Sequence, residues 1–227
     1  MVINGKGIAV SYTKNAGKKI NSKSYALKPV DIKIVPGEVS FILGRSGSGK
    51  TTLLSVLAGL LKPSEGTVLY DAFDIYKEKD DDFSLFRNKN IGFIPQGQSL
   101  IQTLTVRENI LLQARLSDSG SDKSKKADEL INALGLLDRA DYFPKELSGG
   151  EIRRCAIARA LINDPKVIFA DEPTGDLDDD NTEIVFDLLR QKAKEGCAVV
   201  IVTHEESAIR FADAVYRMDA GSLKLSA

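Results

Sequence analysis

Apolar residues along this chain occur in two kinds of run, and each kind predicts a different element. Apolar runs at residues 39–43, 167–170 and 198–202, interrupted only by Ser40, predict buried strands. Leucines at helical spacing follow the first run and predict a helix: Leu53, Leu54, Leu57, Leu60 and Leu61. Strands that alternate with helices in this way predict an α/β fold with a mainly parallel sheet covered on both faces.

The first part of the chain predicts shorter strands at residues 8–12, 25–35, 67–70 and 91–94. The second of these ends at a turn formed by Pro36 and Gly37, and a polar, hairpin-like loop at residues 13–23 precedes it. We therefore expect an antiparallel β subdomain at the N-terminus. The charged run from Lys77 to Asp82 predicts a solvated loop.

The middle of the chain changes character and becomes helical. Residues 106–116 and 125–134 predict helices on either side of a polar linker, and Gly135 suits the end of the second. The α/β pattern then resumes with helices expected at 151–162 and 182–193. We expect residues 97–150 to form an α-helical subdomain inserted into the core, within a single domain that spans residues 1–227.

Composition and charge restrict the classes of function. Of the 227 residues, 43% are apolar and 28% are charged, as in globular proteins that have an ordinary core. The net charge of −1 provides no field that would recruit nucleic acid or an anionic membrane. The apolar runs are far shorter than the ~20 residues that cross a bilayer, and the N-terminus lacks the apolar core of a signal peptide. We therefore expect a cytoplasmic chain, with any membrane role supplied by a partner.

The two cysteines, Cys155 and Cys197, are widely spaced and stand in apolar surroundings. This usage predicts reduced, structural thiols in a reducing compartment.

The most informative segment is a glycine-rich turn between strand 39–43 and the leucine-containing helix. It fits the phosphate-loop pattern G-x-x-x-x-G-K-[ST] and consists of Gly44, Arg45, Ser46, Gly47, Ser48, Gly49, Lys50 and Thr51, followed by Thr52. Backbone N–H groups and the positive end of the helix dipole attract phosphate at such a turn. Lys50 can reach the β- and γ-phosphates, and the Thr51 hydroxyl can bind Mg²⁺. The sequence therefore predicts a site for a nucleoside triphosphate.

Two carboxylates, Asp171 and Glu172, follow the strand at 167–170, at the edge where open α/β sheets bind ligands. Asp171 suits a role at Mg²⁺, opposite the phosphate loop. Glu172 is the better candidate for orienting and activating a water at the γ-phosphate. Taken alone, such a pair can equally cap a helix.

A second helix start also has the chemistry to bind an anion. Ser148 can cap the helix that follows it, and Glu151, three residues later, completes a capping box. Gly149 and Gly150 leave the backbone N–H groups of this turn accessible. One triphosphate needs only one such phosphate-binding turn. The simplest interpretation is that the second turn contacts a nucleotide bound to another copy of the chain.

These motifs together resemble the ATP-binding subunit of ABC transporters. The resemblance is carried by GRSGSGKT, Gln96, LSGGE, VIFADEP, the pair Leu177-Asp178 and His204, whose order and spacing agree from about Ile8 to Gly221. LSGGE is the discriminating motif, because other phosphate-loop ATPases lack it. The resemblance implies a head-to-tail dimer that holds two ATP, each between one phosphate loop and the partner's LSGG segment.

The resemblance also implies roles for individual residues. Gln96 would contact Mg²⁺ and the attacking water and join the two lobes, and His204 would contact the γ-phosphate. Asp178 would lie at the dimer seam. Tyr12 would stack on adenine, with Tyr25 as the competing candidate. Both sets of motifs are intact, so a homodimer is the economical expectation.

The variant DEPTGDLD and the segment LTVREN are similar to the branch that releases lipoproteins and exports macrolides or antimicrobial peptides. That branch implies a separate membrane permease, with this chain peripheral on the inner face of the cell membrane. The sequence departs from the family at Ile152-Arg153-Arg154, where a glutamine-rich run is usual, and at Pro95 and Gly97. Those two positions adjoin the groove that receives the permease.

Other readings stay open. A cell-division ATPase that acts on a membrane protein is a close cousin of the same branch. A soluble ABC ATPase of the iron–sulfur assembly type has the same motifs and a different partner. A monomeric phosphate-loop kinase or GTPase would leave LSGGE without a function, and the chain has no Asn-Lys-x-Asp segment for reading guanine.

Overall fold

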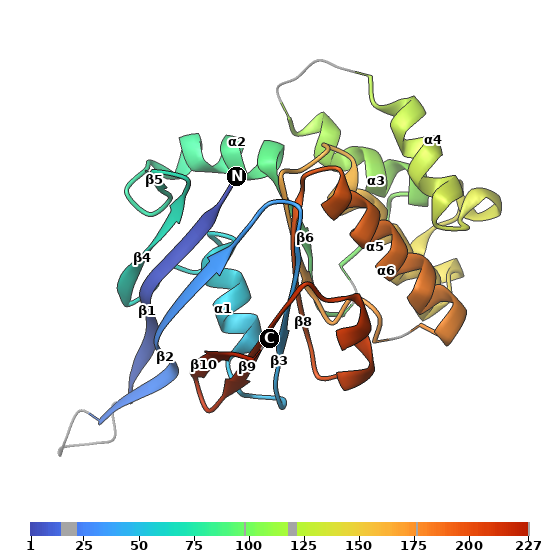
Figure 1. Cartoon of the computed structure of the whole chain (residues 1–227). Helices are drawn as coiled ribbons and strands as arrows, with labels where there is room; N and C mark the ends of the chain where they lie inside the picture. The colour runs from blue at the N-terminus through green and yellow to red at the C-terminus, as the bar shows by residue number, and fades with distance from the viewer. Residues whose placement is uncertain (15–21, 98, 118–121, 176, 227) are drawn as a thin grey trace.

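A computed structural model describes residues 1–14, 22–97, 99–117, 122–175 and 177–226, which form two sheets with helices between and around them (Figure 1). The smaller sheet is antiparallel and has the order β2 (Ser22–Ile34), β1 (Ile3–Lys14), β4 (Glu65–Tyr70) and β5 (Phe73–Asp74). This sheet confirms the expected N-terminal antiparallel subdomain. The predicted loop at residues 13–23 is shorter than expected, because both strands continue into it, and its residues 15–21 lie outside the described part of the chain.

The larger sheet is mainly parallel, as predicted. Its order is β10 (Ser222–Leu225), β9 (Ala214–Asp219), β3 (Val39–Leu43), β8 (Ala198–Thr203), β7 (Val167–Asp171) and β6 (Ile91–Ile94). Among the described strands of this larger sheet, only the β9–β10 pair is antiparallel. Strands β5, β9 and β10 were not predicted, because they are short or partly exposed and lack a continuous apolar run.

Side chains alternate between the two faces of the larger sheet, and each face has its own core. In β8, Val199 and Ile201 belong to the core on one face of this sheet, whereas Val200 and Val202 belong to the core on the other face. Alternation with a period of two is the property of a strand, and a strand covered on both faces reads as a continuous apolar run. This explains why the run at 198–202 contains no polar position.

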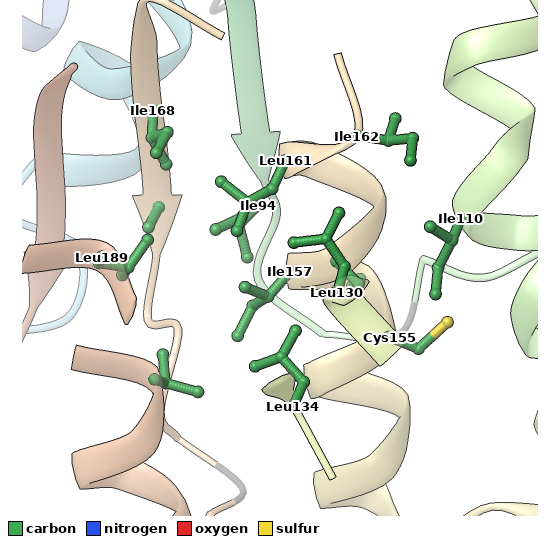
Figure 2. Close-up of a cluster of buried hydrophobic side chains, with 14 of the residues drawn as sticks. Ile94, Ile110, Leu130, Leu134, Cys155, Ile157, Leu161, Ile162, Ile168 and Leu189 are labelled. Atoms are coloured by element: carbon green, nitrogen blue, oxygen red, sulfur yellow. The ribbon is translucent and has the colours of Figure 1, made fainter. Parts of the chain in front are cut away.

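Helix α1 (Lys50–Leu57) lies between the two sheets (Figure 1). On the opposite face of the larger sheet lie α5 (Gly149–Leu161) and α6 (Asp179–Lys194), and α3 (Val106–Arg115) and α4 (Ser124–Ala133) pack outside them. Figure 2 shows how Ile157 and Leu161 of α5 lie among side chains of the sheet and of the outer helices. Helix α5 therefore connects the helical part of the chain to the sheet.

Helix α2 (Asp80–Asn90) corrects part of one expectation, since the charged run from Lys77 to Asp82 was predicted to be a loop and its last three residues are helical. Asp81 and Asp82 lie in the first turn of this helix, where negative charge is favourable. Phe83 is buried, its ring stacks on Phe86, and Arg87 lies over it. Packing of the aromatic face therefore outweighs the polar character of the N-terminal turn.

Short 3₁₀ segments complete the fold: Leu137–Arg139, Pro144–Glu146 and Glu206–Phe211. No helix among the described ranges has the length and apolar character needed to cross a membrane.

A fully buried asparagine fixes the loop that precedes α3. The side-chain oxygen of Asn109 accepts from Ile101 N at 2.8 Å, and its amide donates to the carbonyls of Ile101, Leu104 and Thr105 at 3.1, 2.9 and 3.0 Å. This side chain is the partner of Ile101 N and Leu104 O, whereas Ile101 O also accepts from Leu104 N and Thr105 O also accepts from Asn109 N. Buried backbone groups without partners are costly, so this contact determines how the loop enters the helix.

We expect Asn109→Leu to lower the free energy of unfolding by roughly 3 kcal/mol, because it leaves Ile101 N and Leu104 O without their hydrogen-bond partner. Urea unfolding followed by circular dichroism measures the change. The matched control is Arg115→Ala, an exposed position on the same helix, which we expect to leave stability nearly unchanged. Equal stability of Asn109→Leu and the parent chain would contradict the role assigned to this side chain.

Candidate active site

The parallel strands of the larger sheet end at a common edge, and each delivers a candidate residue there. The register pairs Leu43 with Thr203, Asp171 with Val202, and Ile94 with Ala170. The phosphate loop follows β3, Glu172 follows β7, His204 follows β8, and Gln96 follows β6 after one residue. Residues far apart in the sequence therefore meet because their strands stop at the same level.

A cavity of about 1030 Å³ opens at this edge. Among the expected site residues, it is lined by Gly44, Arg45, Ser46, Gly47, Gly49, Lys50, Thr51, Thr52, Gln96, Asp171, Glu172 and His204. The structure thus brings the phosphate loop, the two carboxylates, the glutamine and the histidine together around one space. The cavity is large enough for a nucleotide.

Glycines allow the phosphate loop to pass close to the neighbouring backbone. A Cβ on Gly44 would lie 2.3 Å from Met218 O, and one on Gly49 would lie 2.7 Å from Ala26 O. Gly49 also has a φ of 108° and Gly47 a φ of 76°, which side chains other than glycine rarely adopt. The backbone of the loop can therefore curve with its N–H groups unobstructed at the start of α1.

Lys50 is buried within this loop. Its Nζ donates to Gly44 O at 2.7 Å and to Arg45 O at 3.2 Å. The ammonium group thus lies over the turn, within the cavity into which the loop faces. The two carbonyls are neutral, and the charge of Lys50 also acts on the carboxylate of Asp171. The ammonium group can therefore attract an anion that enters the cavity.

Asp171 is 2% exposed at the end of β7, and the Thr51 side chain is hydrogen-bonded to it. Burial raises the pKa of Asp171 above its ordinary value, the charge of Glu172 raises it further, and the bond from Thr51 acts in the opposite direction. Two carboxylates that repel one another at a buried edge favour the approach of a cation.

The residues present fit Mg²⁺ that enters together with a nucleotide. Mg²⁺ takes oxygen ligands, commonly one or two carboxylates with substrate phosphates and waters. The side chains of Thr51, Asp171 and Gln96 all offer oxygen and all line the cavity. Within the described residues, no group of three or more His, Cys, Asp and Glu could hold a metal without help. Ser48 is the one residue of the phosphate loop that does not line the cavity, and its buried hydroxyl has no hydrogen-bond partner among the described residues.

Glu172 is held from three sides. Its Oε2 accepts from the Thr203 hydroxyl at 2.9 Å, its Oε1 lies 2.9 Å from Nδ1 of His204, and its backbone N donates to Val202 O. Its φ of 47° is a left-handed conformation that costs about 1–2 kcal/mol for a residue with a side chain. The surrounding bonds maintain this conformation and aim the carboxylate into the cavity.

His204 is the partner of that carboxylate and is mostly exposed. The hydrogen bond with Glu172 and the charge of Glu172 raise the pKa of His204 above its ordinary value near 6.5. The protonated imidazole donates to the Glu172 carboxylate through Nδ1, so the pair is stronger when His204 is charged than when it is neutral. Its stabilisation is lost as the pH rises through the raised pKa of His204.

The second phosphate-binding turn, at Ser148, lies elsewhere on the molecule. Ser148 Oγ accepts from Glu151 N, and Glu151 accepts from Ser148 N, which confirms the predicted capping box at the start of α5. Ser148 and Gly149 are exposed, and neither they nor Gly150 line the cavity. Asp178 is also exposed outside the cavity, where it caps α6 by accepting from Asn181 N.

The two candidate tyrosines differ in position. Tyr25 lines the cavity, whereas Tyr12 is 56% exposed and is not part of the lining. The register pairs Tyr12 with Ser24 and Ser11 with Tyr25, so the two rings project from opposite faces of the β1–β2 ribbon. Stacking of Tyr12 on adenine stays a prediction, with Tyr25 as its alternative.

Sequence reasoning missed the contribution of the β9–β10 hairpin. Gly221 N donates to Ser48 O at 2.9 Å, so the hairpin holds the backbone of the phosphate loop in place. Arg217 and Glu206 form a bidentate ion pair that also lines the cavity. The turn Asp219-Ala220-Gly221 was a usable signal for the hairpin, but no sequence pattern indicated that it would meet the loop.

Comparisons with known proteins agree in family and in fold. A family model described as ABC transporter matches residues 27–175. The lipoprotein-releasing system ATP-binding protein LolD of Bacteroides thetaiotaomicron is 43% identical over 203 residues, which are 87% of this chain and 92% of that protein. The macrolide export ATP-binding/permease protein MacB of Wolinella succinogenes is 39% identical over 198 residues, which are 87% of this chain and 31% of that protein.

Two solved structures of one protein, MJ0796, are similar throughout. The first, described as a dimeric bacterial ABC transporter cassette, has a TM-score of 0.90 and 36% identity and covers 98% of this chain and 96% of its own. The second, a dimeric post-hydrolysis state bound to ADP and Pi, has a TM-score of 0.90 and 34% identity and covers 99% of this chain and 97% of its own.

The single histidine of this chain makes the link between Glu172 and His204 directly measurable. We expect Glu172→Gln to lower the pKa of His204, because it removes the charge and weakens the bond that raise it. NMR titration of the imidazole ring measures the shift. Glu205→Gln serves as the control, since Glu205 contributes less to the raised pKa and its removal should have a smaller effect. An imidazole pKa that is the same with and without the Glu172 charge would refute this pairing.

Proposed function

This chain belongs to the ABC transporter family and is one of its ATP-hydrolysing cassettes, and we propose that it works as a dimer that closes around two ATP to drive a separate membrane permease. One observation carries the proposal. The phosphate loop, Asp171 and Glu172 line one cavity, whereas the second phosphate-binding turn, at Ser148, lies exposed outside it.

Binding of ATP is assigned to the phosphate loop and Lys50. The loop N–H groups and the dipole of α1 take the phosphate oxygens, and Lys50 Nζ moves from the carbonyls of Gly44 and Arg45 to the β- and γ-phosphates. Thr51, Gln96 and Asp171 would hold Mg²⁺. Bound Mg²⁺ neutralises charge that develops on the phosphate oxygens during cleavage.

Hydrolysis is assigned to Glu172, which orients the attacking water and accepts its proton. Phosphoryl transfer requires positioning and charge stabilisation more than covalent chemistry, so a rigidly held carboxylate is suited to the task. Thr203 and His204 each bond one of its two carboxylate oxygens. His204, mostly exposed on the cavity side, would release Glu172 and contact the γ-phosphate once ATP is bound.

Completion of the site requires a second copy of the chain. Ser148 offers a hydroxyl and a helix N-terminus, both exposed, and Asp178 stands exposed at the start of α6. In a head-to-tail dimer these groups would face the nucleotide of the other protomer and the dimer seam. We expect a monomer to bind ATP and to hydrolyse it slowly.

Disulfide crosslinking between protomers tests the dimer. One preparation carries Ser46→Cys and the other Ser148→Cys, each in a Glu172→Gln background that prevents hydrolysis. After mixing with ATP and oxidant, we expect a crosslinked dimer that neither preparation forms alone, because the two positions meet only across the interface. Gel electrophoresis under non-reducing conditions measures it.

The native cysteines should not interfere. Cys155 and Cys197 are buried, and burial raises the pKa of each thiol to about 12, so neither is reactive at neutral pH. Omission of ATP is the control and should abolish the crosslink. If the mixed preparations with ATP gave no dimer band, the proposed arrangement would be wrong.

The partner proposed is a polytopic permease, which would hold this chain at the inner face of the cell membrane. Relatives named for lipoprotein release and macrolide export support this branch. The MacB relative is a longer protein whose name includes a permease, and the match covers 31% of it. A cavity of about 340 Å³ adjoins the loop before Gln96, and Leu60, Arg87 and Phe93 are among its lining residues. We assign this groove to a helix of the permease.

We expect Leu60→Glu to abolish co-purification with the permease from detergent-solubilised membranes, because it places a charge in an apolar contact. The matched control is Leu137→Glu, an exposed leucine outside the groove, which should retain the partner. Mass spectrometry of the purified complexes identifies what is bound. Recovery of soluble scaffold proteins in place of a polytopic subunit would favour the iron–sulfur assembly type, and a cell-division membrane protein would favour the other alternative.

A further inference from the structure

Arg153 is a buried cation at a position where the sequence departs from the glutamine-rich run typical of its family. It lies in α5, four residues after the helix begins at Gly149, and it is 4% exposed. Burial of a guanidinium group costs free energy unless hydrogen bonds and opposite charge compensate it. The contacts of Arg153 therefore indicate what this charge contributes.

Two of its interactions reach the nucleotide site. Nη1 of Arg153 donates to Pro95 O at 2.7 Å, in the loop between β6 and Gln96. The same guanidinium acts electrostatically on Asp171, which is itself buried at the end of β7. Arg153 thus joins the helix that carries Ser148 to two strand ends of the catalytic edge.

The bond to Pro95 acts directly on Gln96. The carbonyl of Pro95 and the N–H of Gln96 belong to one planar peptide unit. A hydrogen bond that holds the Pro95 carbonyl therefore also fixes the orientation of the Gln96 N–H and the direction in which the Gln96 backbone continues. The ring of Pro95 restricts its own φ and removes a further degree of freedom. Gln96 lines the large cavity together with Asp171 and Glu172.

A second arginine of α5 provides a comparison. Arg159 donates through Nη1 to Ser99 O at 2.8 Å and through Nη2 to Ser99 Oγ at 2.7 Å. It therefore holds the same segment from the same helix with the same chemistry, at a residue that does not line the large cavity. The two arginines differ in which part of the segment they fix.

We propose that Arg153 is a positioning residue for ATP hydrolysis, which sets Gln96 against the metal and the attacking water by holding Pro95 O. This inference rests on the proposed function, because it takes Gln96 as a ligand of Mg²⁺. It also gives the helix α5 two tasks. The N-terminus of α5 meets the partner's nucleotide, and one turn later Arg153 reaches the metal site of its own chain.

The test measures metal affinity without turnover. Mn²⁺ replaces Mg²⁺ in the ATP-loaded Glu172→Gln chain, and electron paramagnetic resonance reports free Mn²⁺. We expect Arg153→Met to weaken Mn²⁺ binding roughly 10-fold, the loss usual for a residue that orients a metal ligand. Arg159→Met should leave Mn²⁺ affinity near that of the parent.

A double-variant cycle with Gln96→Ala shows whether Arg153 acts through Gln96. We expect Arg153→Met to cause no further loss once Gln96→Ala is present, since the two act as one unit. Multiplicative losses in the double variant would overturn the proposal, as would an equal loss in Arg159→Met. Arg153→Gln keeps a donor for Pro95 O and should bind Mn²⁺ more tightly than Arg153→Met; equal binding by these two would also overturn it.

The crosslink between Ser46→Cys and Ser148→Cys separates this inference from the proposed function. We expect the crosslink to form in the Arg153→Met background, because that substitution leaves the phosphate loop and the Ser148 cap in place. If the crosslink is absent even with native Arg153, the proposed function fails. If the crosslink forms and Mn²⁺ affinity does not depend on Arg153, the positioning role alone fails.

Discussion

The site depends on a close approach between two stretches of backbone. Gly44 lies so near the carbonyl of Met218 that a single added carbon atom would not fit, and Gly49 lies equally near Ala26. The hairpin of β9 and β10 also donates a hydrogen bond to the loop, from Gly221 N to Ser48 O. The curvature of the phosphate loop is therefore set from outside the loop, by strands that come from both ends of the chain. Lys50 and Thr51 reach the cavity because that curvature directs the start of α1 toward it.

The parallel register supplies the second requirement. Four strand ends stop at one level, so Gln96, Asp171, Glu172 and His204 converge although more than a hundred residues separate the first from the last. The groups that must be rigid are held by short bonds to neighbouring strands, as Glu172 is by Thr203. The groups expected to face a second molecule, Ser148 and Asp178, are exposed at helix starts and are occupied only by their own caps.

Much of the fold could be predicted from the sequence because its signals are local. A strand buried on both faces reads as a nearly continuous apolar run, as in β3, β7 and β8, and the capping box of Ser148 and Glu151 lies within four residues. The phosphate loop is equally local. What escaped prediction depends on contacts between distant segments: the aromatic packing that makes α2 a helix, the β9–β10 hairpin beneath the loop, and the face of the ribbon on which each tyrosine lies. Arg153 belongs with these, since nothing in its own neighbourhood shows that it reaches Pro95.

The left-handed backbone of Glu172 has a consequence for how related chains can diverge. Glycine, asparagine and aspartate tolerate this conformation more readily than other residues, and β-branched side chains tolerate it least. With the role proposed for Glu172, replacements drawn from the tolerant group would stop hydrolysis while relieving local strain, and would leave a cassette that still folds and still binds nucleotide. After gene duplication, asymmetric pairs with one active and one degenerate half-site are thus energetically accessible from this architecture in a single substitution.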